Sequence, residues 1–305
     1  MKISGRGNFY SFHLNIILFI MKFRTEIPVP KYPFQISEQD SILLLGSCFS
    51  AHIGTFLSES RFHVLSNPFG TLFNPVSIAN ALKMTIQPEK FTKDYVYFFD
   101  NRWVSFAHHG SFSHPDEKQL MKQIDEQFSF TKTFLEKTNY LFITFGTSYC
   151  YTFLARNLVV ANCHKIPNHQ FAKFRLDVDE IVQIFKEIIQ NIQQINPSCK
   201  TVFTVSPVRH LGDGFHENQL SKSVLHLAVE QLTDNKKVFY FPAYEILMDD
   251  LRDYRFYAED LCHPSESAIK YVAEIFAETF FSKETKEHLK IVEKENKFLN
   301  HRNIK

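Results

Sequence analysis

Residues that together could activate a hydroxyl group stand in two short stretches of the chain. Asp260 precedes His263 by three positions, in a segment that stops at Pro264. A carboxylate so placed can hold one ring nitrogen of the histidine as a donor, which leaves the other nitrogen free to accept a proton. Far upstream, Ser47 follows Gly46 at the end of an apolar run. The pattern predicts a serine hydrolase with Ser47 as nucleophile, His263 as general base and then acid, and Asp260 as the orienting carboxylate.

Each of these residues also has an ordinary structural interpretation. Gly-Ser is common in turns that follow strands, a late histidine can satisfy backbone groups, and an aspartate near a helix start can be a cap. Cys48 is a competing nucleophile, because a thiol is more reactive once it is deprotonated. If Ser47 points into the cleft, however, its neighbour points elsewhere, into an interior where a free cysteine behaves as a small apolar group. We therefore favour Ser47 and keep a cysteine enzyme as an alternative.

The run Gly46-Ser47-Cys48-Phe49-Ser50, with Asp-x-x-His near the C-terminus, resembles the SGNH/GDSL hydrolase superfamily. More narrowly, the chain is similar to the GSCFA family, which is named after a Gly-Ser-Cys-Phe-Ala run. Other stretches also resemble this family, from about Met21 to the helix after His263. They are KFRTEI (22–27), NPFGT (67–71), ANCHK (161–165), SPVRH (206–210) and DYRFYAED (253–260). The resemblance implies a three-layer α/β/α domain with a mainly parallel central sheet, and an acyl-enzyme formed on Ser47.

The resemblance also implies an oxyanion hole with three donors. Two are the backbone N–H of Ser47 and a glycine after the second strand, for which Gly70 fits. The third is an asparagine side chain in a Gly-x-Asn motif, but the chain has Gly146-Thr147-Ser148 at the expected place. Ser148 or Asn162 is therefore expected to substitute. Loss of one such donor typically lowers the rate about a hundredfold or more, so the missing asparagine also favours an alternative class: a non-catalytic protein that binds a carbohydrate or peptide in the cleft.

Substrate contacts are predicted from polar residues on loops. His108 and His109 follow a run that contains the only tryptophan, although a solvated strand end is an alternative for this pair. Arg209 and His210 follow a predicted strand, at the end where open α/β folds gather their ligand contacts. His164, in the ANCHK stretch, completes the set. The expected substrate is a polar O-acyl ester such as an acylated glycan, and transfer to a sugar hydroxyl would use the same triad.

Cysteine and histidine residues could also be read as metal ligands. Those considered are Cys163, His164, Cys262, His263, His52, His108 and His109. Their spacing does not match a structural zinc pattern, so no metal is predicted. The chain has no glycine-rich phosphate loop and no Gly-x-Gly-x-x-Gly, so no nucleotide or other cofactor is expected.

Composition restricts the partners and the compartment. The net charge of +1 gives no support for nucleic acid as a partner. Five scattered cysteines argue against a disulfide framework and favour a reducing compartment, so the cytoplasm is the expected location. An apolar run at 12–20 follows Lys2 and Arg6 and is similar to a signal h-region, which keeps export open. It is too short for stable membrane insertion, and because the family resemblance begins at Met21, residues 1–20 are interpreted as an extension from an upstream start.

Apolar runs alternate with helical patterns, which is typical of βαβ units. Strands are predicted at 41–46, 61–65, 139–145, 200–206 and 236–241, with helices between them. A small hairpin insertion is predicted over 95–106. The chain should form an SGNH-like domain over 21–282, followed by a charged C-terminal helix or tail at 283–305 that is solvated.

Overall fold

The computed structural model describes residues 24–302, so the predicted N-terminal extension at 1–20 lies outside the described residues. A five-stranded parallel sheet forms the centre, in the order β11-β10-β6-β1-β2. The strands are β1 (Ser41–Gly46), β2 (His63–Ser66), β6 (Tyr140–Phe145), β10 (Lys200–Val205) and β11 (Val238–Tyr240). All five predicted strands are confirmed, although the second begins two residues later and ends one residue later than predicted.

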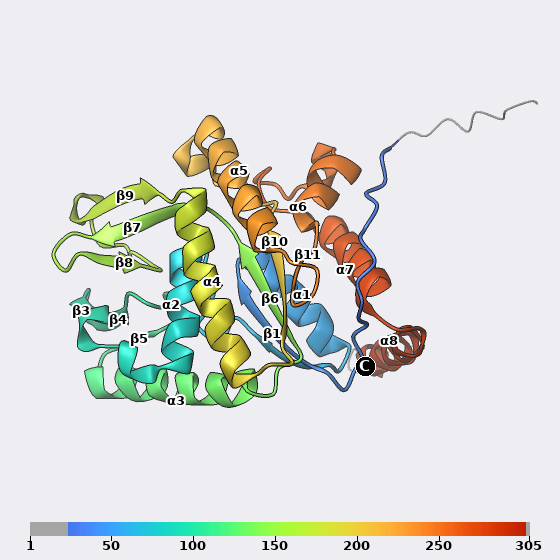
Figure 1. The fold of residues 1–305 in the computed structure, drawn as a ribbon, viewed down its shortest axis with the longest axis horizontal. Coiled ribbons are helices and arrows are strands. Elements are labelled where there is room, and N and C mark those ends of the chain that lie inside the picture. Colours follow the sequence, from blue (N-terminus) through green and yellow to red (C-terminus); the bar gives the residue numbers. More distant parts are fainter. Residues whose placement is uncertain (1–23, 303–305) are drawn as a thin grey trace, which may run out of the picture.

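Helices cover both faces of this sheet, because successive strand side chains point to opposite sides. Leu43 and Leu45 of β1 face the core formed with α2 (Pro75–Ile86), α3 (Glu117–Leu135), α4 (Val178–Ile195) and α5 (Phe215–Leu232). Ile42 and Leu44 face α1 (Cys48–Glu59), α7 (Glu266–Phe280) and α8 (Lys283–Arg302). Figure 1 shows the two helical layers on either side of the sheet. The predicted three-layer α/β/α fold is therefore confirmed.

The helices begin and end where local chemistry favours it. Asp177 and Glu180 form a reciprocal capping box at the start of α4, which satisfies two backbone N–H groups that a helix start leaves free. Asn74 caps α2, and Pro75 follows as its first residue. Shorter helical segments are α6 (Ala243–Glu245), a π-helical turn at Ile246–Asp250, and 3-10 turns at Pro88–Lys90, Lys93–Tyr95, Asn168–Gln170, Leu211–Asp213 and Tyr254–Phe256.

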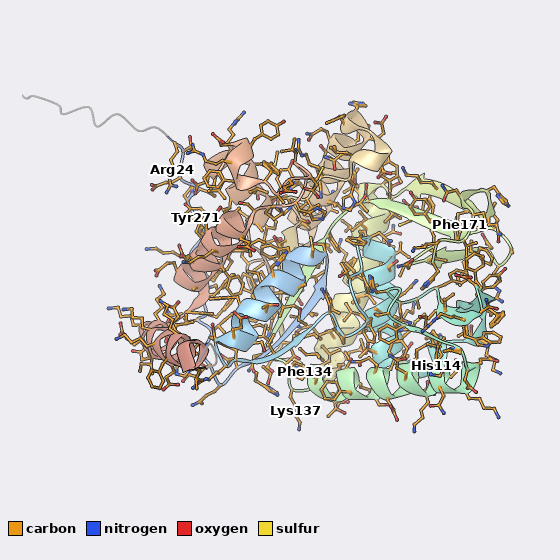
Figure 2. The ribbon with its side chains drawn as sticks, turned by 180° about the vertical axis from the view of Figure 1, so that it is seen from behind. Arg24, His114, Phe134, Lys137, Phe171 and Tyr271 are labelled. Atoms are coloured by element: carbon orange, nitrogen blue, oxygen red, sulfur yellow. The ribbon has the colours of Figure 1, made fainter. Side chains whose placement is uncertain are left out.

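Two small antiparallel sheets lie beside the main domain. The predicted hairpin is present as β3 (Val96–Phe99) and β4 (Arg102–Ser105), and β5 (Ser113–His114) adds a third strand. The other sheet was not predicted and consists of β7 (Tyr149–Phe153), β8 (Leu158–Val160) and β9 (Phe171–Arg175). A small core that includes Phe106 and Phe153 joins the two. In Figure 2, His114 and Phe171 mark these sheets, on the side of the molecule away from Arg24 and Tyr271.

The C-terminal helix α8 is more than a solvated appendage. Its Leu289 and Val292 are buried, and Leu289 belongs to the core that lies under α1 and α7. The first described residue, Arg24, packs its guanidinium over the Tyr271 ring of α7 at 5.4 Å (Figure 2). Within residues 24–302, none of the helices combines the length and the apolar character that a membrane crossing requires.

Candidate active site

A cavity of about 400 Å³ opens at the carboxyl edge of the main sheet. The residues that follow three neighbouring strands line it: Ser47 after β1, Thr147 after β6 and Ser206 after β10. His263, from the segment between the π-helical turn and α7, lines the same cavity. The fold thus brings two residues of the predicted triad together from opposite ends of the chain, at the edge where parallel α/β sheets place their ligands.

Ser47 stands in a tight turn between β1 and α1. Gly46 has a φ of +131°, and a Cβ on it would lie 2.1 Å from the carbonyl oxygen of Thr144, so this turn requires glycine. Ser47 is 1% exposed, and its Oγ makes no hydrogen bond within residues 24–302. The hydroxyl is therefore not yet bonded to His263, although both residues line the cavity.

Asp260 orients His263 through two contacts. Its Oδ2 lies 2.5 Å from His263 Nδ1, and its Oδ1 accepts hydrogen bonds from the backbone N–H groups of Cys262 and His263, each at 2.9 Å. Donation from these backbone groups, and then from the imidazole, lowers the pKa of the Asp260 carboxyl to about 2. Asp260 is therefore ionised at neutral pH, and Nε2 is the imidazole nitrogen that stays available for proton transfer.

Arg209 holds the loop that carries this pair. Its Nη2 donates a hydrogen bond to the carbonyl oxygen of Leu261, which has a φ of +57°. The guanidinium lies 4.9 Å from the centre of the Tyr257 ring and 5.8 Å from that of Tyr254. Arg209 also lines the cavity, as predicted, and at the same time bonds the loop that carries His263.

His210 lines the cavity as well, packed edge-on against the Phe73 ring at 5.7 Å. Burial, with a contribution from the positive charge of Lys222, lowers the pKa of His210 to about 4. The imidazole is therefore neutral at physiological pH and can both donate and accept a hydrogen bond. That state suits a contact with a hydroxyl or carbonyl group of a ligand.

The other three predicted substrate contacts lie outside the cavity. His108 is fully buried, stacks on Phe112 at 4.5 Å and bonds Ser105 Oγ through Nδ1, so the expectation that it faces substrate is corrected. His109 is exposed, and its Cβ crowds the position that a Cβ on Gly70 would take. His164 Nε2 bonds the carbonyl oxygen of Ser105 at 2.7 Å.

The predicted backbone oxyanion donors are engaged elsewhere. The N–H of Ser47 donates to the carbonyl oxygen of Thr144 at 3.2 Å, and that of Gly70 donates to Asn67 O at 2.8 Å. Gly70 does not line the cavity; its φ of +74° serves a turn after β2. In this conformation, both N–H groups that the resemblance assigns to an oxyanion hole are therefore bonded to other backbone atoms.

The two predicted side-chain substitutes do not reach the cavity either. Ser148 is fully buried, and both its N–H and its Oγ bond Ser221 Oγ of α5, at 2.8 and 3.1 Å. Asn162 Oδ1 accepts from the N–H of His164 at 2.7 Å and so shapes the turn that follows β8. Of the side-chain donors named from the sequence, Arg209 and His210 are those that line the cavity.

Part of the cavity wall was missed from the sequence. The unpredicted β7-β8-β9 sheet and the segment before α2 supply it, together with residues after β10. These lining residues are Phe73, Asn74, Tyr149, Tyr151, Val160, Ala161, Cys163, Val208, Gly212 and Asp213. The alternation of Tyr149, Tyr151 and Phe153 was the available signal for a half-buried strand.

Cys48 also lines the cavity and is only partly buried, although the sequence interpretation placed its side chain in the interior. Burial raises the pKa of the Cys48 thiol, which disfavours the thiolate that a cysteine nucleophile needs. Lys222 of α5 is 2% exposed, and its Nζ donates to the carbonyl oxygens of Gly146 and Ser206, at 2.5 and 2.7 Å. Burial lowers the pKa of this amine to about 7. No cluster of three or more histidine, cysteine or acidic side chains suited to a metal ion occurs within residues 24–302.

The topology defines a three-layer α/β/α protein with a serine at the end of β1. The chain belongs to the GSCFA family, whose model matches residues 41–276. No curated protein matches.

Two similar solved structures were found, both at low identity. One is described as "a putative platelet activating factor from Streptococcus pneumonia", with 11% identity, a TM-score of 0.39, and coverage of 78% of this chain and 84% of that one. The other is a carbohydrate esterase family 3 from Talaromyces cellulolyticus, with 8% identity, a TM-score of 0.37, and coverage of 84% and 99%.

Proposed function

We propose that this protein is a serine-dependent ester hydrolase that acts on a polar O-acyl ester, such as an acylated glycan, through an acyl-enzyme on Ser47. One observation carries the proposal: His263, hydrogen-bonded to Asp260 at 2.5 Å, lines the same cavity as the serine at the carboxyl end of β1. Membership of the GSCFA family supports the same chemistry.

The proposed reaction uses one proton shuttle twice. Ser47 Oγ attacks the carbonyl carbon of the ester while His263 Nε2 takes its proton, which gives a tetrahedral oxyanion and an imidazolium stabilised by Asp260. Collapse breaks the bond to the alcohol, which leaves with the proton from His263. Water then attacks the acyl-enzyme, again losing its proton to Nε2, and the carboxylic acid is released as Ser47 regains its hydrogen.

The reaction requires a rearrangement of Ser47 and His263 in the described site. Ser47 Oγ is buried without a hydrogen-bond partner among the described residues, so it must turn toward His263. A serine rotamer change is fast compared with typical turnover. His263 has room to move as well, since its side chain is 54% exposed. Catalytic hydrogen bonds often tighten only when substrate is bound.

The cavity walls suggest how such an ester would lie. Phe73, Tyr151 and Val160 present apolar surface, which suits the acyl group. Arg209 and His210 supply polar atoms that suit the hydroxyl-rich alcohol portion. An acyltransferase would use the same residues, with a sugar hydroxyl in place of water as the acceptor.

Intact-mass labelling with a fluorophosphonate tests the proposal. The serine oxygen displaces fluoride from phosphorus and leaves one covalent adduct on an activated serine. We expect one adduct on the wild type, lost in Ser47→Ala and in His263→Ala but retained in Cys48→Ala, which is the matched neighbouring control. An adduct lost only in Cys48→Ala would instead support the cysteine alternative.

A second candidate function is a non-catalytic protein that binds a carbohydrate or peptide in the cavity. The observation that favours it is the buried, unbonded Oγ of Ser47 in the described structure, next to an N–H that Thr144 already engages. This candidate predicts no adduct on folded wild-type protein. If an adduct does form on Ser47, competition between water and added sugars for a labelled acyl group would distinguish a hydrolase from an acyltransferase.

A further inference from the structure

A serine hydrolase of this kind needs a side-chain donor for the oxyanion. Two hydroxyls at the edge of the sheet, those of Thr147 and Ser206, already take part in hydrogen bonds of their own loops. The hydroxyl of Thr147 lies 3.1 Å from Ser221 Oγ and accepts from the N–H of Tyr149. Ser206 Oγ accepts from the N–H of Val208 at 3.3 Å. Both hydroxyls are therefore already part of the loops that form the edge of the sheet.

Asn74 is different, because only one end of its amide is used. It lines the cavity and is 6% exposed. Its Oδ1 caps helix α2 by accepting from the N–H of Ser77 at 2.8 Å. That contact fixes which end of the amide is oxygen and which is nitrogen. Within residues 24–302, Nδ2 donates no hydrogen bond, so two N–H groups of a nearly buried side chain are left for a ligand.

The backbone next to Asn74 is tied to the segment where the resemblance places the missing asparagine. The carbonyl oxygen of Phe73 accepts from the N–H groups of Gly146 and Thr147, at 2.8 and 3.1 Å. Lys222 Nζ in turn bonds the carbonyl oxygen of Gly146. Asn74 therefore stands beside the Gly146-Thr147-Ser148 segment, held by the same hydrogen-bonded frame.

We propose that Asn74 Nδ2 is the side-chain oxyanion donor of this enzyme, supplied from the start of α2 in place of the asparagine that the loop after β6 lacks. This inference rests on the proposed function. A rigid donor suits the task, because an oxyanion hole stabilises the transition state only if its donors are already oriented. The cap on α2 and the frame around Gly146 provide that rigidity.

The test uses Asn74→Ser and Asn74→Asp, which keep an oxygen that caps α2 and remove the amide N–H groups. Serine and aspartate cap helices about as well as asparagine, so the fold should be retained. Asp116→Ser, the same kind of exchange at the cap of helix α3 and outside the cavity, is the matched control. The measurements are the rate and completeness of fluorophosphonate labelling on the full chain, with thermal unfolding as a check.

We expect Asn74→Ser to lower the maximal labelling rate about a hundredfold, with little change in the probe concentration that gives half-maximal rate, because the phosphonyl oxygen occupies the oxyanion position. Asn74→Asp should lower the maximal labelling rate further, since it adds a negative charge beside the oxyanion position. Both variants should still reach a full single adduct, and Asp116→Ser should react like wild type.

Two results would overturn the inference, and they differ. If wild type and Asn74→Ser label Ser47 at the same rate, the donor lies elsewhere while the proposed hydrolase stands. If folded wild type forms no adduct on Ser47, the proposed function fails and the role of Asn74 falls with it.

Discussion

Asp260 binds both the ring and the backbone of His263: one carboxylate oxygen lies 2.5 Å from Nδ1, and the other accepts from the N–H of the same residue at 2.9 Å. The loop around them is closed by a hydrogen bond from the N–H of Ala258 to the carbonyl oxygen of His263, at 2.8 Å. The imidazole therefore has a defined tautomer and a defined attachment, although its side chain is 54% exposed. An imidazole held in this tautomer is what the proposed nucleophile Ser47 would require.

Asp260→Asn should separate these two functions of the carboxylate. Its amide oxygen can still accept from the backbone N–H groups of Cys262 and His263, while its NH2 group would face Nδ1 and favour the tautomer that cannot accept a proton at Nε2. We expect kcat for ester hydrolysis to fall by about 10²- to 10⁴-fold, the range for losing general base catalysis. Thermal unfolding should stay close to wild type. Equal activity in the two proteins would show that the pair has no role in catalysis.

Arg209→Lys should loosen the histidine loop. Lysine lacks the planar guanidinium that lies against Tyr257 while it bonds the carbonyl oxygen of Leu261. We expect kcat to fall by about tenfold or more through a displaced His263, an estimate based on the sensitivity of catalysis to misplacement. Steady-state kinetics and the NMR titration of His263 would measure the change.

Arg255→Lys is the matched control for Arg209→Lys. Arg255 stands in the same segment, but its side chain is 73% exposed and pairs with Asp253. Its replacement should leave kcat within about twofold of wild type, since surface ion pairs contribute little. If both variants lose the same activity, the segment as a whole is sensitive and the specific contact of Arg209 is not supported.

The main fold could be predicted from the sequence because its strands are buried on both faces and read as continuous apolar runs, as in Leu141 to Phe145. That Ser47 and His263 would line the same cavity could be predicted from the Gly-Ser and Asp-x-x-His motifs. The role of Asn74 could not, because it depends on hydrogen bonds between Phe73 and a loop more than seventy positions away. His108 was misplaced for a similar reason.

The aromatic residues that bury His108 are distant in the sequence. Phe69 and Phe128 lie against its ring, at 5.5 and 5.4 Å, and neither could be assigned as a neighbour from local patterns. A histidine on a loop is more often exposed or half-exposed. The stacked ring of Phe112 completes an enclosure in which a charged imidazole has no solvent.

His108 should make the protein less stable in acid. Burial, with repulsion from His164, lowers its pKa to about 3, so the folded state keeps it neutral where the unfolded chain, with a pKa near 6.5, takes up a proton. Stability is therefore unaffected above about pH 6.5 and falls as pH decreases toward 3. The expected loss from this group is roughly 2 kcal/mol at pH 5.

His108→Phe should remove that contribution. We expect urea unfolding at pH 7 and pH 5 to give a free-energy difference about 2 kcal/mol smaller than in wild type. His216→Phe, at an exposed position of α5, should keep the wild-type difference. An unchanged pH dependence in His108→Phe would mean that the imidazole is not held neutral in the folded state.

Lys222 should produce a pH response of the same sign as that of His108, but in a more alkaline window. Burial lowers its pKa to about 7, so between pH 7 and pH 9 the unfolded chain binds a proton that the folded state loses. Stability should then rise with pH, by about 1.4 kcal/mol per unit at most. Of the titratable groups that face it, His210 and His226 have lowered pKa values and Cys48 a raised one, so none of them titrates inside this window.

Lys222→Met tests this response, since methionine has a similar length and no charge. The variant leaves the carbonyl oxygens of Gly146 and Ser206 without their donor, which should cost about 1–3 kcal/mol, and it removes a desolvated amine, which offsets part of that loss. Urea unfolding at pH 7, 8 and 9 should show rising stability in wild type and in the exposed control Lys118→Met, and a flat profile in Lys222→Met. A flat profile of unfolding free energy against pH in the wild type would mean that the buried amine keeps its proton. Because Lys222 holds the loop beside Asn74, Lys222→Met should also react more slowly with fluorophosphonate.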